Sequence, residues 1–227
     1  VGAVAVSPSQ PEQVWVGTGE NNPRNSVSWG DGVYKSYDGG ASWHHMGLKG
    51  SFQISTIVVH PENPDIVYVG ALGHLWGPND ERGLFKTTDG GKNWEKVLFV
   101  DDLTGVIDIR MQPGNSEVLL VATYERERDG FDTNTPAKAG GPGSGIYRTK
   151  DGGQTWMELT EGLPEIELGR IGIDYSYQNP DVLFAVIESE RSGSLAEDTA
   201  YMGMSGEDAD VGARITRLTE EGAAENA

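Results

Sequence analysis

One eight-residue pattern occurs three times in this chain and constrains its fold more than any other feature. Each copy reads Ser or Thr, any residue, Asp-Gly-Gly, two further residues and Trp, and the copies span residues 36–43, 87–94 and 149–156. Their aspartates are 51 and then 62 residues apart. A repeat of about 50 residues built from short strands is typical of radial or stacked β architectures. The pattern therefore predicts a fold more directly than an activity.

Each copy lies between two short apolar runs, which together predict a β-hairpin. The glycines adopt positive φ at little cost, the aspartate can accept hydrogen bonds from its own turn, and the tryptophan can cover the hairpin. We interpret these residues as structural rather than as metal ligands or catalytic groups. They are Ser36, Asp38, Gly40, Trp43, Thr87, Asp89, Gly91, Trp94, Thr149, Asp151, Gly153 and Trp156.

The repeat extends upstream of each copy. Residues 4–17 and 57–70 match each other as two apolar runs around a Pro-containing turn, residues 109–122 form a third version, and residues 171–186 open a fourth. One unit therefore contains four strands, with the Asp-Gly-Gly turn between the third and the fourth. We predict an all-β fold: a partial β-propeller of four-stranded antiparallel blades, about three and a half of them, over residues 1–188.

The eight-residue pattern resembles the Asp-box of the bacterial neuraminidase repeat. The whole unit, including Trp-Val-Gly-Thr-Gly-Glu20 and Gly-Asp-Gly-Val-Tyr-Lys-Ser36, resembles the bacterial sortilin-like propeller proteins that carry the label glycosyl hydrolase. Asp-box propellers include sialidases, xyloglucan-cleaving enzymes, sorting receptors and assembly factors, so the resemblance is specific for fold and weak for chemistry. It also implies an extracytoplasmic location, secreted or periplasmic. Because closed rings need more blades, we expect either a segment of a longer protein or closure through association of copies.

The C-terminal part departs from the repeat. Residues 189–199 read as a linker, and residues 200–227 resemble the first part of a PDZ domain, stopping before that domain would be complete. In PDZ domains the equivalent loop offers backbone N–H groups to a peptide C-terminus. The resemblance implies this role for Tyr201, Met202, Gly203 and Met204, with an ordinary strand and helix start as the alternative. We expect the truncated segment not to bind peptides.

The composition excludes several classes of function. The formal net charge is −18, whereas nucleic-acid binding needs clustered Lys and Arg. The absence of cysteine excludes disulfides, thiol catalysis and Cys-based zinc sites. His44 and His45 are adjacent on a predicted strand and therefore face opposite sides, so they cannot share a metal. We predict no cofactor and no metal site. With no apolar run of 18 residues, we also expect no membrane span in this segment.

The long variable loops are the expected binding site. In antiparallel four-stranded blades, the Asp-Gly-Gly turns lie on one face, and the loops at residues 20–31, 73–82 and 124–145 lie on the other. Binding residues concentrate on loops over a rigid scaffold. Trp29 and Trp76 either stack on sugar rings or plug their own loops against the blade. The ligand-binding candidates are Glu20, Asn22, Arg24, Trp29, Asp31, His74, Trp76, Glu125 and Arg126.

No catalytic residue emerges from the sequence. Glycoside hydrolysis needs two carboxylates roughly 5–5.5 or 6.5–9.5 Å apart, and no spacing singles out a pair in so acidic a chain. The arginine cluster and the Phe/Tyr-Arg-Ile-Pro-like motif of a sialidase are both missing from the sequence pattern, and the alternating charges of residues 125–128 predict a solvated or self-paired rim.

We therefore interpret the protein as a non-enzymatic scaffold whose loops bind a protein, peptide or glycan ligand. The alternative is part of a polysaccharide-acting glycoside hydrolase of the Asp-box propeller type. A purely structural or assembly role is a third possibility. The discriminating experiment is a screen of the full-length protein on glycans, with Glu20, Asp31 and Glu125 each changed to the amide.

Overall fold

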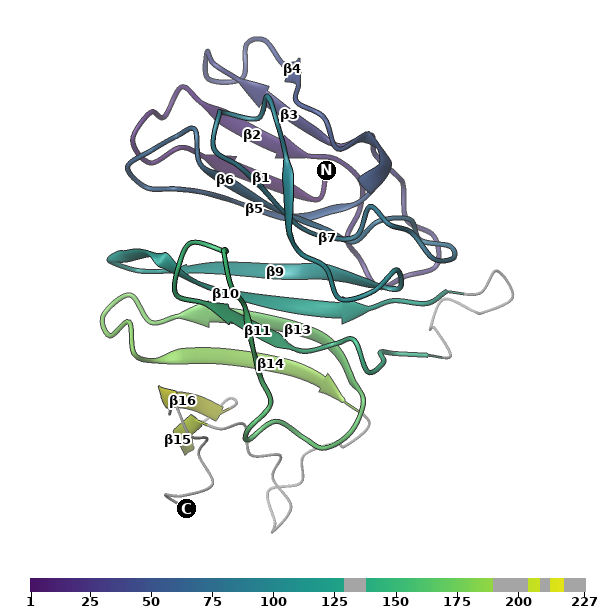
Figure 1. The fold of residues 1–227 in the computed structure, drawn as a ribbon, viewed down its shortest axis with the longest axis vertical. Coiled ribbons are helices and arrows are strands. Elements are labelled where there is room, and N and C mark those ends of the chain that lie inside the picture. The colour runs from purple at the N-terminus through teal and green to yellow at the C-terminus, as the bar shows by residue number, and fades with distance from the viewer. Residues whose placement is uncertain (129–137, 190–203, 209–212, 219–227) are drawn as a thin grey trace.

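The structure of the protein is a computed structural model that describes residues 1–128, 138–189, 204–208 and 213–218 (Figure 1). Blade 1 consists of β1 (Ala3–Val6), β2 (Val14–Gly17), β3 (Val33–Ser36) and β4 (His44–His45). Blade 2 consists of β5 (Ile54–Val59), β6 (Val67–Ala71), β7 (Gly83–Thr87) and β8 (Glu95–Leu98). Blade 3 consists of β9 (Thr104–Gln112), β10 (Asn115–Glu125), β11 (Ile146–Thr149) and β12 (Met157–Leu159).

Two strands of a fourth blade follow, β13 (Leu168–Tyr175) and β14 (Leu183–Ser189), and then a separate hairpin of β15 (Met204–Asp208) and β16 (Ala213–Leu218). Within each sheet the strands pair antiparallel in chain order, and the blades lie beside one another in the same order (Figure 1). The first strands of successive blades adjoin, and the Ser55 hydroxyl in β5 donates to the Val106 carbonyl in β9 at 2.6 Å. The all-β, partial-propeller prediction is confirmed.

The hydrophobic core lies between the blades. One cluster fills the space between blades 1 and 2 around Trp15 and Val69, another lies between blades 2 and 3, and a third lies between blades 3 and 4. A strand with a neighbouring blade on each side is covered on both faces, and all five residues of β6 are buried. In contrast, Val4 and Val6 on the outer side of β1 are 62% and 52% exposed. Burial thus follows the number of neighbouring blades.

The repeated turns are closed by their aspartates. The Asp89 carboxylate accepts hydrogen bonds from the Thr87 hydroxyl at 2.8 Å, the Asn93 amide at 3.0 Å and the Asn93 side chain at 2.7 Å. The Gly91 amide donates back to the Thr87 hydroxyl at 2.9 Å. Equivalent bonds surround the aspartates of the other two copies, Asp38 and Asp151. The aspartate therefore organises its own turn, as a structural role requires.

The same turns define one face of the molecule. In each complete blade, the first glycine of the Asp-Gly-Gly turn donates its amide to a carbonyl in the turn between the blade's first two strands or, in blade 3, near the start of the second strand. The pairs are Gly39 with Glu12 at 2.9 Å, Gly90 with Asp65 at 3.0 Å and Gly152 with Glu117 at 2.9 Å. Because the strands alternate in direction, the long variable loops and the connections between blades lie at the opposite ends of the strands. We call this opposite side the loop face.

The tryptophan of the repeat reaches beyond its own hairpin. Trp94 in blade 2 donates its indole N–H to the Met46 carbonyl of blade 1 at 2.7 Å. Its ring meets Trp15 edge-on, with 6.1 Å between ring centroids. Trp156 also packs against the cluster between blades 2 and 3, although its indole N–H has no hydrogen-bond partner among the described residues, whereas Trp43 is 42% exposed. Trp94 and Trp156 thus join their blades to the one before.

Acid should weaken these turns. Hydrogen bonds to the carboxylate lower the pKa of Asp38 and Asp89 to about 2 and also lower that of Asp151. Since these values lie below the unfolded value of about 3.9, the stabilisation is complete above about pH 4 and is lost as the pH falls toward 2. We expect the urea midpoint to fall over this range more steeply in the wild type than in a variant with Asp38, Asp89 and Asp151 all changed to Asn. Parallel pH profiles would contradict the assignment.

The PDZ interpretation stays a prediction. Tyr201, Met202 and Gly203, like most of the expected linker, lie outside the described residues, and Met204 begins β15. The described residues contain no helix long and apolar enough to cross a membrane.

Candidate functional site on the loop face

Backbone hydrogen bonds tie the variable loops of the loop face to the connections between blades. Gly30 in the first variable loop donates to the Phe52 carbonyl at 2.7 Å, in the connection from blade 1 to blade 2. Asn79 in the second loop donates to the Asp102 carbonyl at 2.8 Å, in the connection from blade 2 to blade 3. Side chains carried on these segments are therefore held in fixed positions over the blades.

Three rings from different segments form an aromatic row: Trp29, Phe52 and His74. The Trp29 and Phe52 centroids are 6.4 Å apart, and Phe52 stacks on His74 at 4.1 Å with 29° between the planes. Trp29 is 75% exposed and therefore does not plug its loop; Trp76, in the same loop as His74, is 46% exposed. Phe52 and His74 are partly buried and cover one another's faces, so Trp29 is the solvent-exposed end of the row.

Phe52 is the member of this row that sequence reasoning missed, because it lies in the connection before β5 and outside the long variable loops. It follows the short 3-10 helix η1 (Lys49–Ser51) and has φ +50°, which is uncommon for an aromatic residue. Leu48, before η1, has φ +58°. Backbone strain of this kind concentrates at binding and catalytic sites. Here it places the Phe52 ring between Trp29 and His74.

The acidic candidates of the first loop are engaged in local bonds. Glu20 accepts from the Ser28 amide at 2.9 Å and lies 3.8 Å from the Arg24 guanidinium. Asp31 accepts from the Tyr34 hydroxyl at 2.8 Å, and this bond raises the pKa of Tyr34. Asn22, in the same loop, is exposed. These contacts shape the loop and leave its polar surface toward solvent.

The charged run at residues 125–128 differs from the sequence prediction. It was expected to be a solvated or self-paired rim, but Glu125, Arg126 and Arg128 are all buried. Glu125 accepts from the Gly143 amide and from Lys138, both at 2.8 Å. The reason is that β10 continues through Glu125, so the chain enters the third loop while still packed against the neighbouring blade.

The structure also gathers arginines that the sequence pattern did not group. Arg82 and Arg126 are 0% and 1% exposed and both donate to the His74 carbonyl, at 3.0 and 3.4 Å. Arg128 donates to the Pro23 carbonyl at 3.0 Å, which links the third loop to the first. The sequence pattern lacks the arginine cluster of a sialidase, and this buried group, which is bonded to backbone carbonyls, was not predicted from it. These arginines come from two blades, so sequence spacing could not reveal the cluster.

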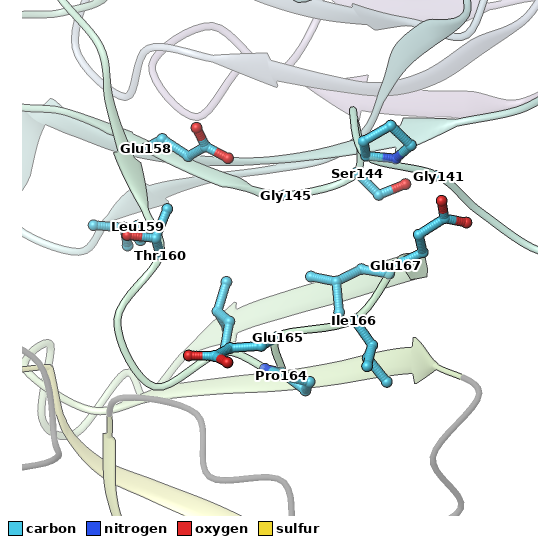
Figure 2. Close-up of a pocket in the computed structure, with 13 residues that line it drawn as sticks. Gly141, Ser144, Gly145, Glu158, Leu159, Thr160, Pro164, Glu165, Ile166 and Glu167 are labelled. Carbon is cyan, nitrogen blue, oxygen red and sulfur yellow. The ribbon is translucent and has the colours of Figure 1, made fainter.

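A pocket of about 240 Å³ lies on the same face, between the third variable loop and the connection from blade 3 to blade 4 (Figure 2). Figure 2 shows Glu158, Glu165 and Glu167 at different points around it, with Pro164 and Ile166 supplying apolar wall. None of the nine sequence candidates lines this pocket, because the connection to blade 4 is short and was not among the variable loops. Within the described ranges, no three His, Cys, Asp or Glu side chains are placed to hold a metal ion.

Comparisons with known proteins identify carbohydrate-active relatives. A probable oligoxyloglucan-reducing end-specific xyloglucanase of Neosartorya fischeri is 32% identical over 99 residues, covering 41% of this chain and 10% of the relative. A xyloglucanase of a Paenibacillus species is 28% identical over 173 residues, covering 70% of this chain and 16% of the relative. The chain thus spans between a tenth and a sixth of the length of these curated relatives.

Solved structures confirm the propeller fold. An ancestral GH74 enzyme superposes with a TM-score of 0.58 at 22% identity, covering 80% of this chain and 21% of that enzyme. The GH74 xyloglucanase from Xanthomonas campestris gives a TM-score of 0.57 at 15% identity, covering 80% of this chain and 26% of that one. At these identities the likeness concerns the fold.

The relatives overturn the functional interpretation made from the sequence. The non-enzymatic binding scaffold is contradicted, because the similar proteins are xyloglucanases, and the glycoside hydrolase alternative has the better support. The family assignment itself agrees with the sequence resemblance. A family model described as "Sortilin, neurotensin receptor 3" (Sortilin-Vps10) matches residues 31–206, well over half of the 227 residues. The chain therefore belongs to the Sortilin-Vps10 family.

Proposed function

We propose that the protein is a glycoside hydrolase of the Asp-box propeller type that acts on a xyloglucan-like polysaccharide, and that this segment binds the glycan on its loop face. Two independent observations support the proposal. The curated relatives are xyloglucanases. The loop face presents the aromatic row, in which Trp29 is 75% exposed.

The aromatic row is the structural observation that supports glycan binding by this chain. Sugar rings have apolar faces of C–H bonds, and flat aromatic side chains with a polar rim bind them in sites that are otherwise open to water. Trp29, Phe52 and His74 come from three segments that are fixed by backbone bonds, so their relative positions exist before the ligand arrives. The stacked Phe52 and His74 therefore support the exposed Trp29 ring, which is the surface proposed to bind a sugar.

Within this proposal, the first-loop and buried carboxylates serve structure and binding. Glu125 is buried and paired with Lys138, and Glu20 and Asp31 accept local hydrogen bonds. A general acid or nucleophile must instead reach the glycosidic bond. We therefore assign the first variable loop and the start of the third to substrate binding in the hydrolase. Because a polysaccharide does not enter the cytoplasm as a polymer, the proposal includes an extracellular or periplasmic site of action.

The test is the Trp29→Ala variant of the full-length protein assayed on xyloglucan. Loss of one stacked ring should weaken glycan binding by about 1–1.5 kcal/mol, which is a rise in KM of roughly 5- to 15-fold. Reducing-end release from xyloglucan measures KM, and affinity electrophoresis in xyloglucan measures glycan binding. The matched control is Trp43→Ala, which removes an exposed tryptophan from the opposite face and should leave KM unchanged.

Two results would contradict the proposal. If the full-length protein releases no reducing ends from xyloglucan or other β-glucans, the hydrolase assignment is wrong. If it hydrolyses xyloglucan but Trp29→Ala and Trp43→Ala have equal KM values, the loop face of this segment is not the glycan surface.

A further inference from the structure

Arg82 and Arg126 form a buried pair of cations between the loops of blades 2 and 3. Arg82 lies at the end of the second variable loop and Arg126 directly after β10. Both donate to the His74 carbonyl, and Arg82 also donates to the Arg126 carbonyl at 3.4 Å. The two guanidinium groups are therefore neighbours, and both side chains are at most 1% exposed.

The partners of this pair are neutral. Arg82 donates to the Leu103 carbonyl at 2.9 Å and the Gly77 carbonyl at 3.2 Å, and Arg126 donates to the Gln53 side-chain oxygen. Across the described part of the chain, no carboxylate lies within salt-bridge distance of either guanidinium. Asp101, Asp102 and Glu125 act on Arg82 only through space. The positive charge is thus solvated by dipoles and distant acids.

Three guanidinium nitrogens remain without a hydrogen-bond acceptor among the described residues: Arg82 Nε, Arg126 Nε and Arg126 Nη1. Buried donors are almost always paired, and an unpaired donor on a charged group is especially costly. Arg128 and Arg170 add further positive potential around Arg126. Burial and these neighbouring cations lower the pKa of Arg126 to about 9, so it still carries its charge at neutral pH.

We propose that a small inorganic anion of chloride size binds at an unpartnered nitrogen of Arg126, beside Arg82. A water molecule would accept the hydrogen bonds, but it would leave two adjacent cations with no anion in contact in a region of low dielectric. An extended anionic ligand would need an opening, whereas Arg126 is 1% exposed. The anion would fasten the second variable loop to the start of the third, and this role is independent of glycan hydrolysis.

The direct test is a bromide soak of crystals of the full-length protein. We expect an anomalous difference peak within hydrogen-bonding distance of Arg126 Nε or Nη1. A water molecule, or a carboxylate of the protein, refined at this position without anomalous signal would overturn the proposal.

The solution test compares Tm in sodium chloride and in sodium gluconate at equal ionic strength. Because a ligand that binds only the folded state stabilises it by RT ln(1 + [L]/Kd), chloride should add about 2–4 °C in the wild type relative to the Arg126→Met variant. Arg24→Met, which removes a half-exposed surface arginine, is the matched control and should retain the chloride effect. If Arg126→Met does not fold, the Tm values of the wild type and of Arg24→Met in bromide, chloride and gluconate still test whether the stabilisation is specific for a small anion. Equal responses to all three salts would overturn the proposal.

Discussion

Replacing Trp94 with alanine should lower the free energy of unfolding by about 3 kcal/mol, which corresponds to a fall in Tm of about 6–12 °C in a chain of this size. The indole is partly buried between two blades, meets the fully buried Trp15 edge-on, and donates to the Met46 carbonyl. Its removal therefore opens a cavity between blades and leaves a backbone acceptor without its partner. Thermal or urea unfolding followed by circular dichroism measures the loss.

Two variants of the repeat provide the comparison. Asp89→Ala removes hydrogen bonds at an exposed turn and should lower Tm by less than Trp94→Ala does. Trp43→Ala removes the equivalent tryptophan of blade 1, which is 42% exposed, and should have the smallest effect of the tryptophan variants. Equal melting temperatures for Trp94→Ala and Asp89→Ala would show that the turn, and not the contact between blades, is the main source of stability.

Replacing Gly91 with alanine should lower the free energy of unfolding by about 2–4 kcal/mol, for two reasons that can be tested separately. Gly91 has φ +93°, a conformation that an alanine adopts only with strain. In addition, a Cβ atom at this position would lie 2.7 Å from the Trp15 ring and 3.1 Å from the Met46 methyl. Trp15 is held by Trp94, so its ring cannot move aside without disturbing the contact between blades.

The Gly40→Ala variant isolates the effect of the positive φ. Gly40 is the equivalent glycine of the first repeat and has φ +97°, but its added Cβ would meet its nearest neighbour, the Trp43 ring, at an ordinary 3.5 Å. We expect this variant to be destabilised only by the backbone strain, which lowers the free energy of unfolding by about 1–2 kcal/mol. The difference between the two variants in urea midpoint measures the steric contact. If Gly40→Ala and Gly91→Ala are equally destabilised, the close approach of Gly91 to Trp15 does not contribute.

Local patterns were sufficient to predict the fold. Ser/Thr, Asp, Gly-Gly and Trp at fixed spacing determine a hairpin through bonds within a few residues, as the Thr87, Asp89 and Gly91 contacts show. Repetition of that hairpin after a second strand pair then determines a four-stranded blade. The expectation that the long loops lie opposite these turns follows from strand alternation alone.

The functional interpretation could not be reached in the same way. The sequence favoured a non-enzymatic scaffold because no pair of carboxylates stood out, and similarity to xyloglucanases contradicted it. Phe52 escaped notice because its position in the aromatic row depends on a strained turn after η1, which has no simple sequence signature. The pocket beside Glu158 and Glu165 escaped notice because a short connection forms one of its walls.

The sequence by itself determined the blades, since each is built from hydrogen bonds and apolar contacts between residues close along the chain. Only the tertiary structure decided which side chains meet across blades. Arg82 and Arg126 are 44 residues apart and belong to different blades, yet they share one carbonyl, and Trp29 reaches the row through Phe52 of the next connection. Such contacts depend on how the sheets pack, because packing brings together the loop ends of neighbouring sheets whose separation in sequence carries no signal.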